Sequence, residues 1–149
     1  MLVGKKVIIL GDRDGIPSYV ISALMEEAGY EVAYRAVECF LCSQEGVMDP
    51  DDQAAILRLA RTHGPANLAV VLGLINPDSI RTNVTTLTSG DPSAVGPLHG
   101  VKLELKFYHV LESGFRQHFN GKTYDKHLGF YLEFGDFEQI EKVMEELRE

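Results

Sequence analysis

Residues 5–10 have the sequence Lys-Lys-Val-Ile-Ile-Leu and are followed directly by Gly11. Three of these residues are β-branched, and the aliphatic side chains are consecutive rather than alternating with polar ones. A short apolar run that ends at a glycine is typical of a strand covered on both faces. We therefore predict that this strand lies in the centre of a sheet.

Helical and extended patterns alternate along the chain after this strand. Gly29 stands where a helix C-terminal cap belongs, and Asp49 followed by Pro50 is typical of an N-cap and a first helical position. The elements expected in the first half are a helix over 18–28, a strand over 31–37, a helix from Pro50 to Gly64 and a buried strand over 67–73.

The same alternation continues with weaker signals in the second half. Asn76-Pro77 repeats the cap-plus-proline start, and Asp136 is a further N-cap candidate. We expect a Thr-rich helix ending near Ser89-Gly90, an edge strand over 101–108 with one wet face, a short helix around 115–120 with a further helix or strand up to 131, and a last helix whose Phe137, Ile140, Met144 and Leu147 face inward.

Alternating strands and helices with short connections predict an α/β fold. The predicted architecture is a single domain over 1–149, a three-layer sandwich with a mainly parallel, doubly wound sheet of the flavodoxin or Rossmann type. The carboxyl ends of parallel strands meet at one edge of a sheet. We therefore expect Gly11–Gly15, Cys39–Cys42 and Gly73–Asn76 to open onto the same edge.

The charge balance excludes some partners. Lysine and arginine number 14 and aspartate and glutamate 22, a net charge of −8, which repels nucleic acids and acidic membrane surfaces. No apolar run is long enough to cross a membrane, and the first residues lack the pattern of a secretory signal. We expect a cytoplasmic protein that binds neither nucleic acid nor membrane.

Cys39 and Cys42 follow the second predicted strand and are separated by two residues. Side chains three positions apart on a helical turn lie about 5–6 Å apart at Cβ, from which a small adjustment reaches disulfide geometry. If Cys42 lies near a helix start, its thiol pKa falls, and it could act as a nucleophile that Cys39 resolves. The alternatives are two buried apolar thiols and a zinc site, for which His63 has no second partner at the required spacing.

Asp12, Arg13, Asp14 and Gly15 join the first strand to the first helix, where α/β proteins often bind phosphate. Two carboxylates would repel a phosphate, and no glycine-rich nucleotide motif is present. Two interpretations stay open. The segment is a capped turn with its glycines at positive φ, or Arg13 and the aspartates orient a substrate or contact a partner.

His109, His118 and His127 fall on amphipathic or irregular stretches. Each is predicted to be a partly exposed structural histidine rather than a base or a metal ligand.

Three separated motifs together resemble one family. They are residues 4–17, the segment Glu38-Cys39-Phe40-Leu41-Cys42, and the glycines and prolines of residues 90–101. In colinear order over nearly the whole chain, they resemble component A, the selenoprotein A of the glycine, sarcosine and betaine reductase complex.

The resemblance implies a carrier role within a multi-subunit reductive deaminase of amino-acid fermentation. In this family a selenolate takes a carboxymethyl group from substrate activated on a pyruvoyl-bearing component B, which also selects among the three substrates. Component C then removes the two-carbon unit as acetyl phosphate, and thioredoxin reduces the oxidised component A. The resemblance implies no bound metal or nucleotide, and no activity without the partners.

The sequence departs from the family at one position. Cys42 falls where the family has selenocysteine, and Cys39 matches the cysteine that closes a selenide-sulfide bond with it. A thiol is a poorer nucleophile at neutral pH and a poorer leaving group than a selenol, because both properties follow acidity. Cys42 is either natural or a replacement for selenocysteine.

Two other functions fit the same residues. A flavodoxin-like module could use the strand-end loops to bind a small molecule or a nucleotide. A general thiol-disulfide oxidoreductase could use Cys39 and Cys42 without carboxymethyl chemistry.

Overall fold

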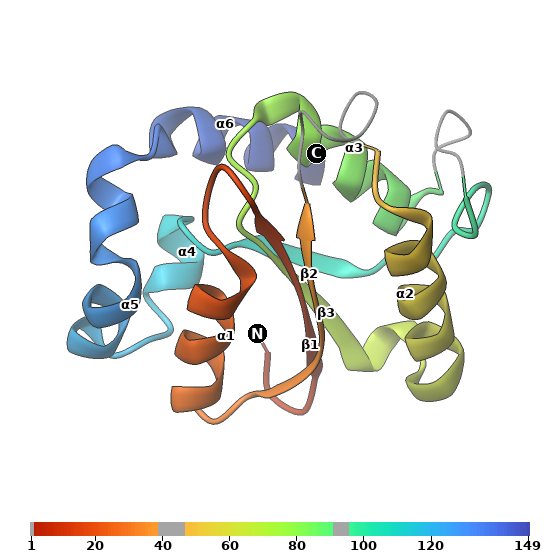
Figure 1. Cartoon of the computed structure of the whole chain (residues 1–149), viewed down its shortest axis with the longest axis horizontal. Coiled ribbons are helices and arrows are strands. Elements are labelled where there is room, and N and C mark those ends of the chain that lie inside the picture. Colours follow the sequence, from red (N-terminus) through yellow and green to blue (C-terminus); the bar gives the residue numbers. More distant parts are fainter. Residues whose placement is uncertain (1, 39–46, 91–95) are drawn as a thin grey trace.

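The computed structural model describes residues 2–38, 47–90 and 96–149 and shows a parallel sheet between helices (Figure 1). The elements in chain order are β1 (Lys6–Asp12), α1 (Ser18–Glu27), β2 (Glu31–Glu38), α2 (Pro50–His63), the short 3-10 helix η2 (Pro65–Asn67), β3 (Leu68–Leu72), α3 (Pro77–Thr88), β4 (Lys106–His109), α4 (Ser113–Arg116), α5 (Gly121–Phe134) and α6 (Phe137–Arg148).

The four strands pair in the order β2-β1-β3-β4, and every pair is parallel. All residues of β1 after Lys6 are buried, and so is all of β3. This burial confirms that the run around Val7–Leu10 forms a central strand. Burial of apolar side chains on both faces stabilises the sheet by roughly 25 cal/mol per Å² removed from water.

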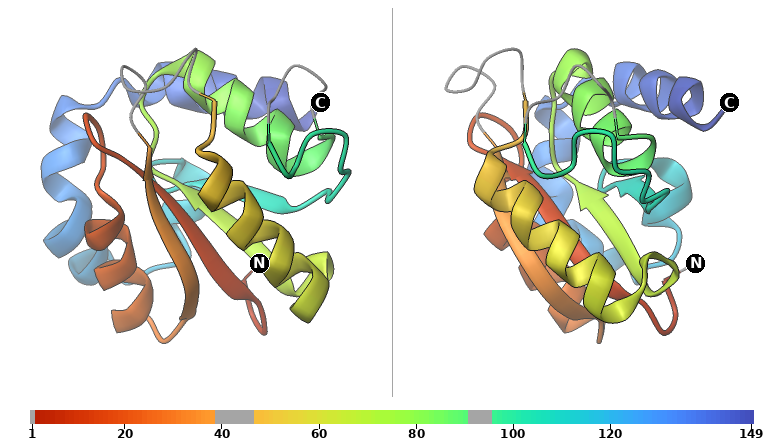
Figure 2. Two further views of the ribbon diagram at one scale, coloured as in Figure 1. Left: turned by 45° about the vertical axis from the view of Figure 1, so that its right-hand side comes forward. Right: turned by 90° about the vertical axis from the view of Figure 1, so that its right-hand side faces the viewer.

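Helices cover both faces of the sheet, as predicted. Figure 2 shows α1 and α5 on one side of the strands and α2 and α3 on the other. Helix α1 packs against β1, β2 and α5, while α6 packs against α3 and β4. The fold is therefore a doubly wound α/β sandwich. Among the described residues, no helix combines the length and the apolar character that crossing a membrane requires.

Side-chain caps set the helix starts where the sequence predicted them. Asp49 accepts a hydrogen bond from the backbone N–H of Asp51, and Asn76 accepts from two N–H groups in the first turn of α3. Asp136 caps α6 in the same way. Gly29, beyond the end of α1, has a φ of +90°, which a glycine adopts without strain.

The strand predicted over 101–108 is wrong at its first half, because β4 begins only at Lys106. The N–H groups of Glu104 and Leu105 donate instead to the carbonyls of Thr88 and Leu87 at the end of α3. They satisfy helix-end acceptors and are not free to pair with β3. The strand itself lies at an edge, as predicted.

Two further predictions need correction. The short helix lies over Ser113–Arg116 rather than 115–120, and the ambiguous stretch after it is the helix α5, capped by Asn120. In α6, Ile140 and Met144 are buried, but Phe137 is 37% exposed and does not face inward. It lies at the first turn, where the guanidinium of Arg116 covers its ring at 5.4 Å.

Candidate functional site at the carboxyl edge of the sheet

The two predicted reactive residues, Cys39 and Cys42, lie outside the described residues. Their pairing and their nucleophilic role therefore stay predictions. The structure defines the two ends of the segment that carries them. It leaves β2 after Glu38 and leads into α2, which begins at Pro50. The described residues therefore establish the surroundings of Glu38, the residue directly before Cys39 in the sequence.

Backbone hydrogen bonds hold the loops after β1 and β3 together at this edge. The N–H of Arg13 donates to the carbonyl of Glu38 at 2.8 Å, which joins the β1 loop to the end of β2. The N–H of Ile16 donates to the carbonyl of Gly73 at 3.2 Å. The predicted convergence of Gly11–Gly15 with Gly73–Asn76 is confirmed, and β2 ends beside them.

Asp12 joins the loops after β1 and β3 at this edge. Its side chain is 4% exposed and accepts hydrogen bonds from the N–H groups of Asp14 and Ile75, each at 3.1 Å. Burial raises the pKa of Asp12, and the two backbone hydrogen bonds oppose that rise. Asp12 therefore acts as a cap for two loops, whereas Arg13 and Asp14 are exposed.

The glycines of the β1 loop serve close packing rather than an unusual φ. Neither Gly11 nor Gly15 has a positive φ, so that part of the turn interpretation is wrong. A Cβ on Gly11 would lie 2.2 Å from the backbone nitrogen of Ser18, and one on Gly15 would lie 2.9 Å from a methyl carbon of Ile75. Glycine is required because the loop folds tightly onto its neighbours.

An acidic network, which sequence analysis did not predict, lies at the end of β2 around the buried side chain of Glu38. The carboxyl group of Glu38 is hydrogen-bonded to that of Asp52 in the first turn of α2. The hydroxyl of Tyr34 donates to Asp52 Oδ1 at 2.5 Å. Among the described residues, the buried Oε1 atom of Glu38 has no hydrogen-bond partner.

Burial, followed by the negative charge and hydrogen bond of Asp52, raises the pKa of Glu38 to about 8. Glu38 is therefore mostly protonated at pH 7 and can donate to Asp52. Burial and the same carboxylate raise the pKa of Tyr34 to about 12. The sequence held one indication of this network. Side chains alternate between the two faces of a strand, so Glu38 lies on the same inward face as Tyr34 and Ala36.

His109 is fully buried, which corrects the prediction of partial exposure. Its Nε2 bonds the carbonyl of Leu74 at 2.7 Å, and its Nδ1 lies 3.1 Å from the donating N–H of Leu111. These partners require a neutral ring with the proton on Nε2, and burial lowers the pKa of His109 to about 4. The residue joins the end of β4 to the loop after β3 and has a structural role.

The other two histidines lie nearer the surface. His118 is exposed, and His127 is half-buried beside the carboxylate of Glu27. Within the described ranges, no cluster of three or more His, Asp or Glu side chains is arranged to hold a metal ion.

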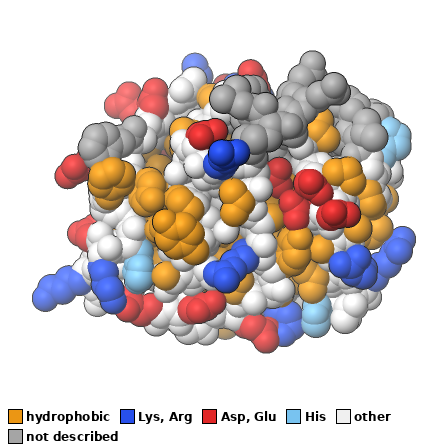
Figure 3. Space-filling model, viewed as in Figure 1, with side chains coloured by type: hydrophobic (Ala, Val, Ile, Leu, Met, Phe, Trp, Pro, Cys, Tyr) orange, Lys and Arg blue, Asp and Glu red, His pale blue; other side chains and the backbone are white. Residues whose placement is uncertain are grey.

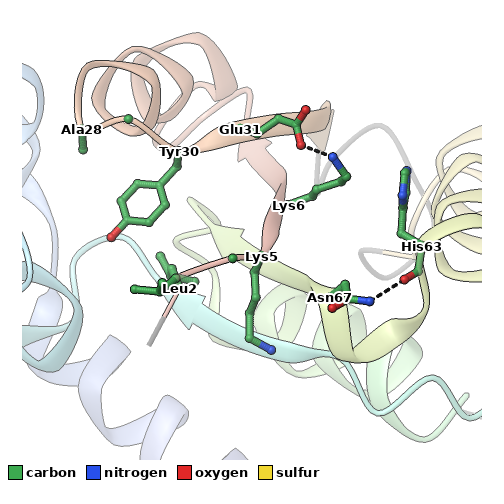
Figure 4. A pocket seen from close by; sticks show the side chains of 11 residues that line it. Leu2, Lys5, Lys6, Ala28, Tyr30, Glu31, His63 and Asn67 are labelled. Carbon is green, nitrogen blue, oxygen red and sulfur yellow. Dashed lines mark hydrogen bonds and ion pairs between the residues drawn. The ribbon is translucent and has the colours of Figure 1, made fainter.

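Among the hollows that the described residues form, two lie at opposite ends of the strands. One of about 600 Å³ lies at the amino ends and is lined by Lys5, Lys6, Tyr30 and His63, among others (Figure 4). Figure 4 shows that Lys6 pairs with Glu31 and that Asn67 bonds the carbonyl of His63. The polar groups that line this hollow are thus largely bonded to one another.

The second hollow has a volume of about 420 Å³ and lies at the carboxyl edge. We call it the switch-point hollow, because it opens between the loops that follow β1 and β3. From these two neighbouring strands the chain turns to opposite faces of the sheet. Its lining includes Asp14, Ile16, Ile75, Phe130, Tyr131 and Asp136.

These features define a doubly wound α/β protein whose candidate site lies at the carboxyl edge of a parallel sheet. The sequence model of the family described as glycine reductase complex selenoprotein A matches residues 2–148. The chain belongs to this family.

Relatives named as component A of the glycine/sarcosine/betaine reductase complex come from several organisms. The chain is 39% identical over 148 residues to the glycine/sarcosine/betaine reductase complex component A of Gottschalkia purinilytica, covering 99% of both chains. It is 37% identical over 145 residues to the component A of Clostridium botulinum (strain ATCC 19397 / Type A), covering 97% of this chain and 92% of the relative. The component A of Carboxydothermus hydrogenoformans is 42% identical over 126 residues, 85% of this chain and 81% of the relative. No solved structure gives a significant match.

Proposed function

We propose that this chain is the redox-active carboxymethyl carrier of a glycine, sarcosine or betaine reductase complex, with Cys42 as the nucleophile and Cys39 as the resolving thiol. The observation that carries the proposal is family membership over residues 2–148 together with two cysteines directly after β2. In open parallel sheets this edge is where reactive groups and ligands collect.

The first step is a displacement on a substrate held by component B. The Cys42 thiolate attacks the substrate methylene carbon, a carbon–sulfur bond forms, and the carbon–nitrogen bond breaks with its electron pair on the nitrogen. The product is a thioether that carries a carboxymethyl group. The substrate amine stays on, or leaves from, component B.

The second step is an internal thiol exchange that reduces the carbon. The Cys39 thiolate attacks the sulfur of Cys42, the sulfur–carbon bond breaks, and its electron pair goes to the carbon, which takes up a proton. The two sulfur atoms are oxidised to a disulfide while the carbon gains two electrons. Component C captures the two-carbon unit before it is released as acetate: inorganic phosphate replaces one carboxylate oxygen, which leaves as water, and acetyl phosphate forms. Thioredoxin supplies the two electrons that reopen the disulfide.

The charges around the end of β2 bear on the thiols. Carboxylates near a thiol raise its pKa and reduce the thiolate fraction. A Glu38 that holds its proton at pH 7 removes one negative charge from the residue bonded to Cys39. The protonated carboxyl is also a group that could exchange a proton with a neighbouring thiol, because its pKa lies close to that of a thiol.

Mass spectrometry tests the proposal directly. The reduced protein is incubated with component B and glycine, sarcosine or betaine, and its peptides are then mapped. We expect one carboxymethyl group on Cys42, its absence in Cys42→Ser, and its accumulation in Cys39→Ser when component C is added, since resolution is then blocked. An adduct elsewhere, or none with any substrate, contradicts the carrier role.

The same protein preparation distinguishes the carrier role from the alternative function, a general thiol-disulfide oxidoreductase. A general oxidoreductase reduces disulfides of unrelated proteins without components B and C. A carrier specific to the complex does so slowly, although thioredoxin still reduces its own Cys39–Cys42 disulfide. Fast reduction of an unrelated disulfide, combined with no adduct, would favour the general function.

A further inference from the structure

We propose that the switch-point hollow and the apolar surface around it form the docking surface for component B, which inserts a large apolar side chain flanked by a lysine or arginine. The inference rests on the proposed carrier function and goes beyond it by assigning the surface. The hollow lies near the end of β2. The N–H of Arg13 donates to the carbonyl of Glu38, the last residue of β2, and the next residue, Asp14, lines the hollow.

The surface exposes more apolar area than a solvated face requires. Phe130 is 65% exposed and Ile75 is 41% exposed, and both line the hollow. Tyr19 is 66% exposed and lies near enough to Tyr131 to affect its pKa. Figure 3 shows apolar side chains gathered over α1 and α5 on this face. Contiguous exposed apolar groups of this kind mark interaction sites.

The charges on the rim favour a basic partner. Asp14, from the loop after β1, and Asp136, between α5 and α6, both line the hollow, in a chain of net charge −8. An anionic small molecule would be repelled there. A second copy of this chain packed symmetrically would bring these carboxylates face to face with the same acidic surface, which is unfavourable.

Component B fits this requirement by its chemistry. It binds amino acids that present a free carboxylate, and carboxylates are recognised by lysine or arginine side chains. A carboxylate-binding enzyme therefore has basic groups near the mouth of its site. The carrier must bring its nucleophile to that mouth, and an acidic rim at the carboxyl edge of the sheet, where β2 also ends, is complementary to it.

Binding measurements with matched variants test this docking surface. Phe130→Glu should weaken binding to component B about 30-fold, as expected for the loss of a central anchor. Val3→Glu is the control, since Val3 is 88% exposed and lies by the hollow at the opposite end of the strands. It should bind like the unchanged protein.

A second pair of variants tests the charges without disturbing the fold. Asp14→Asn and Asp136→Asn keep a side-chain oxygen acceptor, which preserves the cap of α6. Together they should weaken binding a few-fold at low salt and flatten its salt dependence, because the attraction is screened by ions.

The outcomes distinguish failure of the docking surface from failure of the proposed carrier function. If the unchanged protein receives the carboxymethyl group from component B, yet Phe130→Glu and the two asparagine variants bind component B normally, the docking surface is wrong and the carrier function stands. Loss of binding only to component C or thioredoxin, or self-association of the unchanged protein that Phe130→Glu abolishes, also overturns the assignment. If no adduct forms on the unchanged protein, the carrier function itself fails.

Discussion

The carboxylate of Asp12 accepts a hydrogen bond at 3.1 Å from the backbone N–H of Ile75, 63 positions further along the chain. This contact joins the loop after β1 to the loop after β3, the two segments between which the switch-point hollow opens. The side chain that holds the frame is therefore distinct from Asp14, which lies on the rim of the hollow.

Asp12→Ala should lower the free energy of unfolding by about 1–3 kcal/mol, because it leaves two part-buried N–H groups without their acceptor. Asp12→Asn, which keeps one oxygen, should lose less. Urea denaturation at pH 7 measures both changes. Asp14→Ala is the exposed control and should stay within about 0.5 kcal/mol of the unchanged protein. Equal losses at both positions would contradict the capping role.

Gly11→Ala should destabilise the protein by about 1–3 kcal/mol, because overpacking forces the backbone apart. The added Cβ would lie 2.2 Å from the backbone nitrogen of Ser18, which cannot rotate away as a side chain could. Gly121→Ala is the matched control, since a Cβ there meets nothing within 4 Å. The control should be neutral or slightly stabilising in thermal unfolding. A neutral Gly11→Ala would show that β1 and α1 can separate.

Glu38→Gln should change how stability depends on pH. In the folded protein burial raises the Glu38 pKa from 4.5 to about 8, so the folded state holds a proton that the unfolded state releases. This group therefore lowers stability as pH rises between about 4.5 and 8, with a slope of at most about 1.4 kcal/mol per pH unit. The difference in unfolding free energy between variant and unchanged protein should shift in the variant's favour over that range. A constant difference would mean that Glu38 is ionised throughout.

His109→Gln should produce the opposite trend at lower pH. Burial lowers the pKa of His109 from 6.5 to about 4, so the unfolded state takes up a proton before the folded state does. The stability that the neutral ring contributes is present above pH 6.5 and is lost as the pH falls toward 4. The variant should be less stable at pH 7 and lose less on acidification. Chemical denaturation at several pH values measures this, and parallel curves for the two proteins would refute it.

Placing selenocysteine at position 42 should raise acetyl phosphate formation with components B and C by about tenfold or more. A thiol near its ordinary pKa is only a few per cent ionised at neutral pH, whereas the more acidic selenol is largely ionised. Disulfide formation with Cys39 and reduction by thioredoxin should remain possible for the cysteine form. An unchanged rate in the complete complex would mean that attack by position 42 does not limit turnover.

Local sequence patterns predicted most of the framework. The apolar run of β1, the N-caps Asp49 and Asn76 and the glycine after α1 work through neighbouring atoms, so their consequences are visible within a few residues. The pattern over 101–105 was misleading because those residues alternate like a strand but bond to the end of α3. An alternating hydrophobic pattern does not indicate which hydrogen-bond acceptors the backbone N–H groups of that stretch will contact.

The sequence by itself determined a doubly wound α/β fold, the meeting of strand-end loops and the family to which the chain belongs. Only the tertiary structure decided that Glu38 is buried beside Asp52 with a raised pKa, that His109 is fully buried and neutral, and that Phe130 lines a hollow with Ile75. The reason is physical. Element type and caps depend on contacts within a turn or a strand, while the burial and pKa of a side chain depend on partners brought from distant positions.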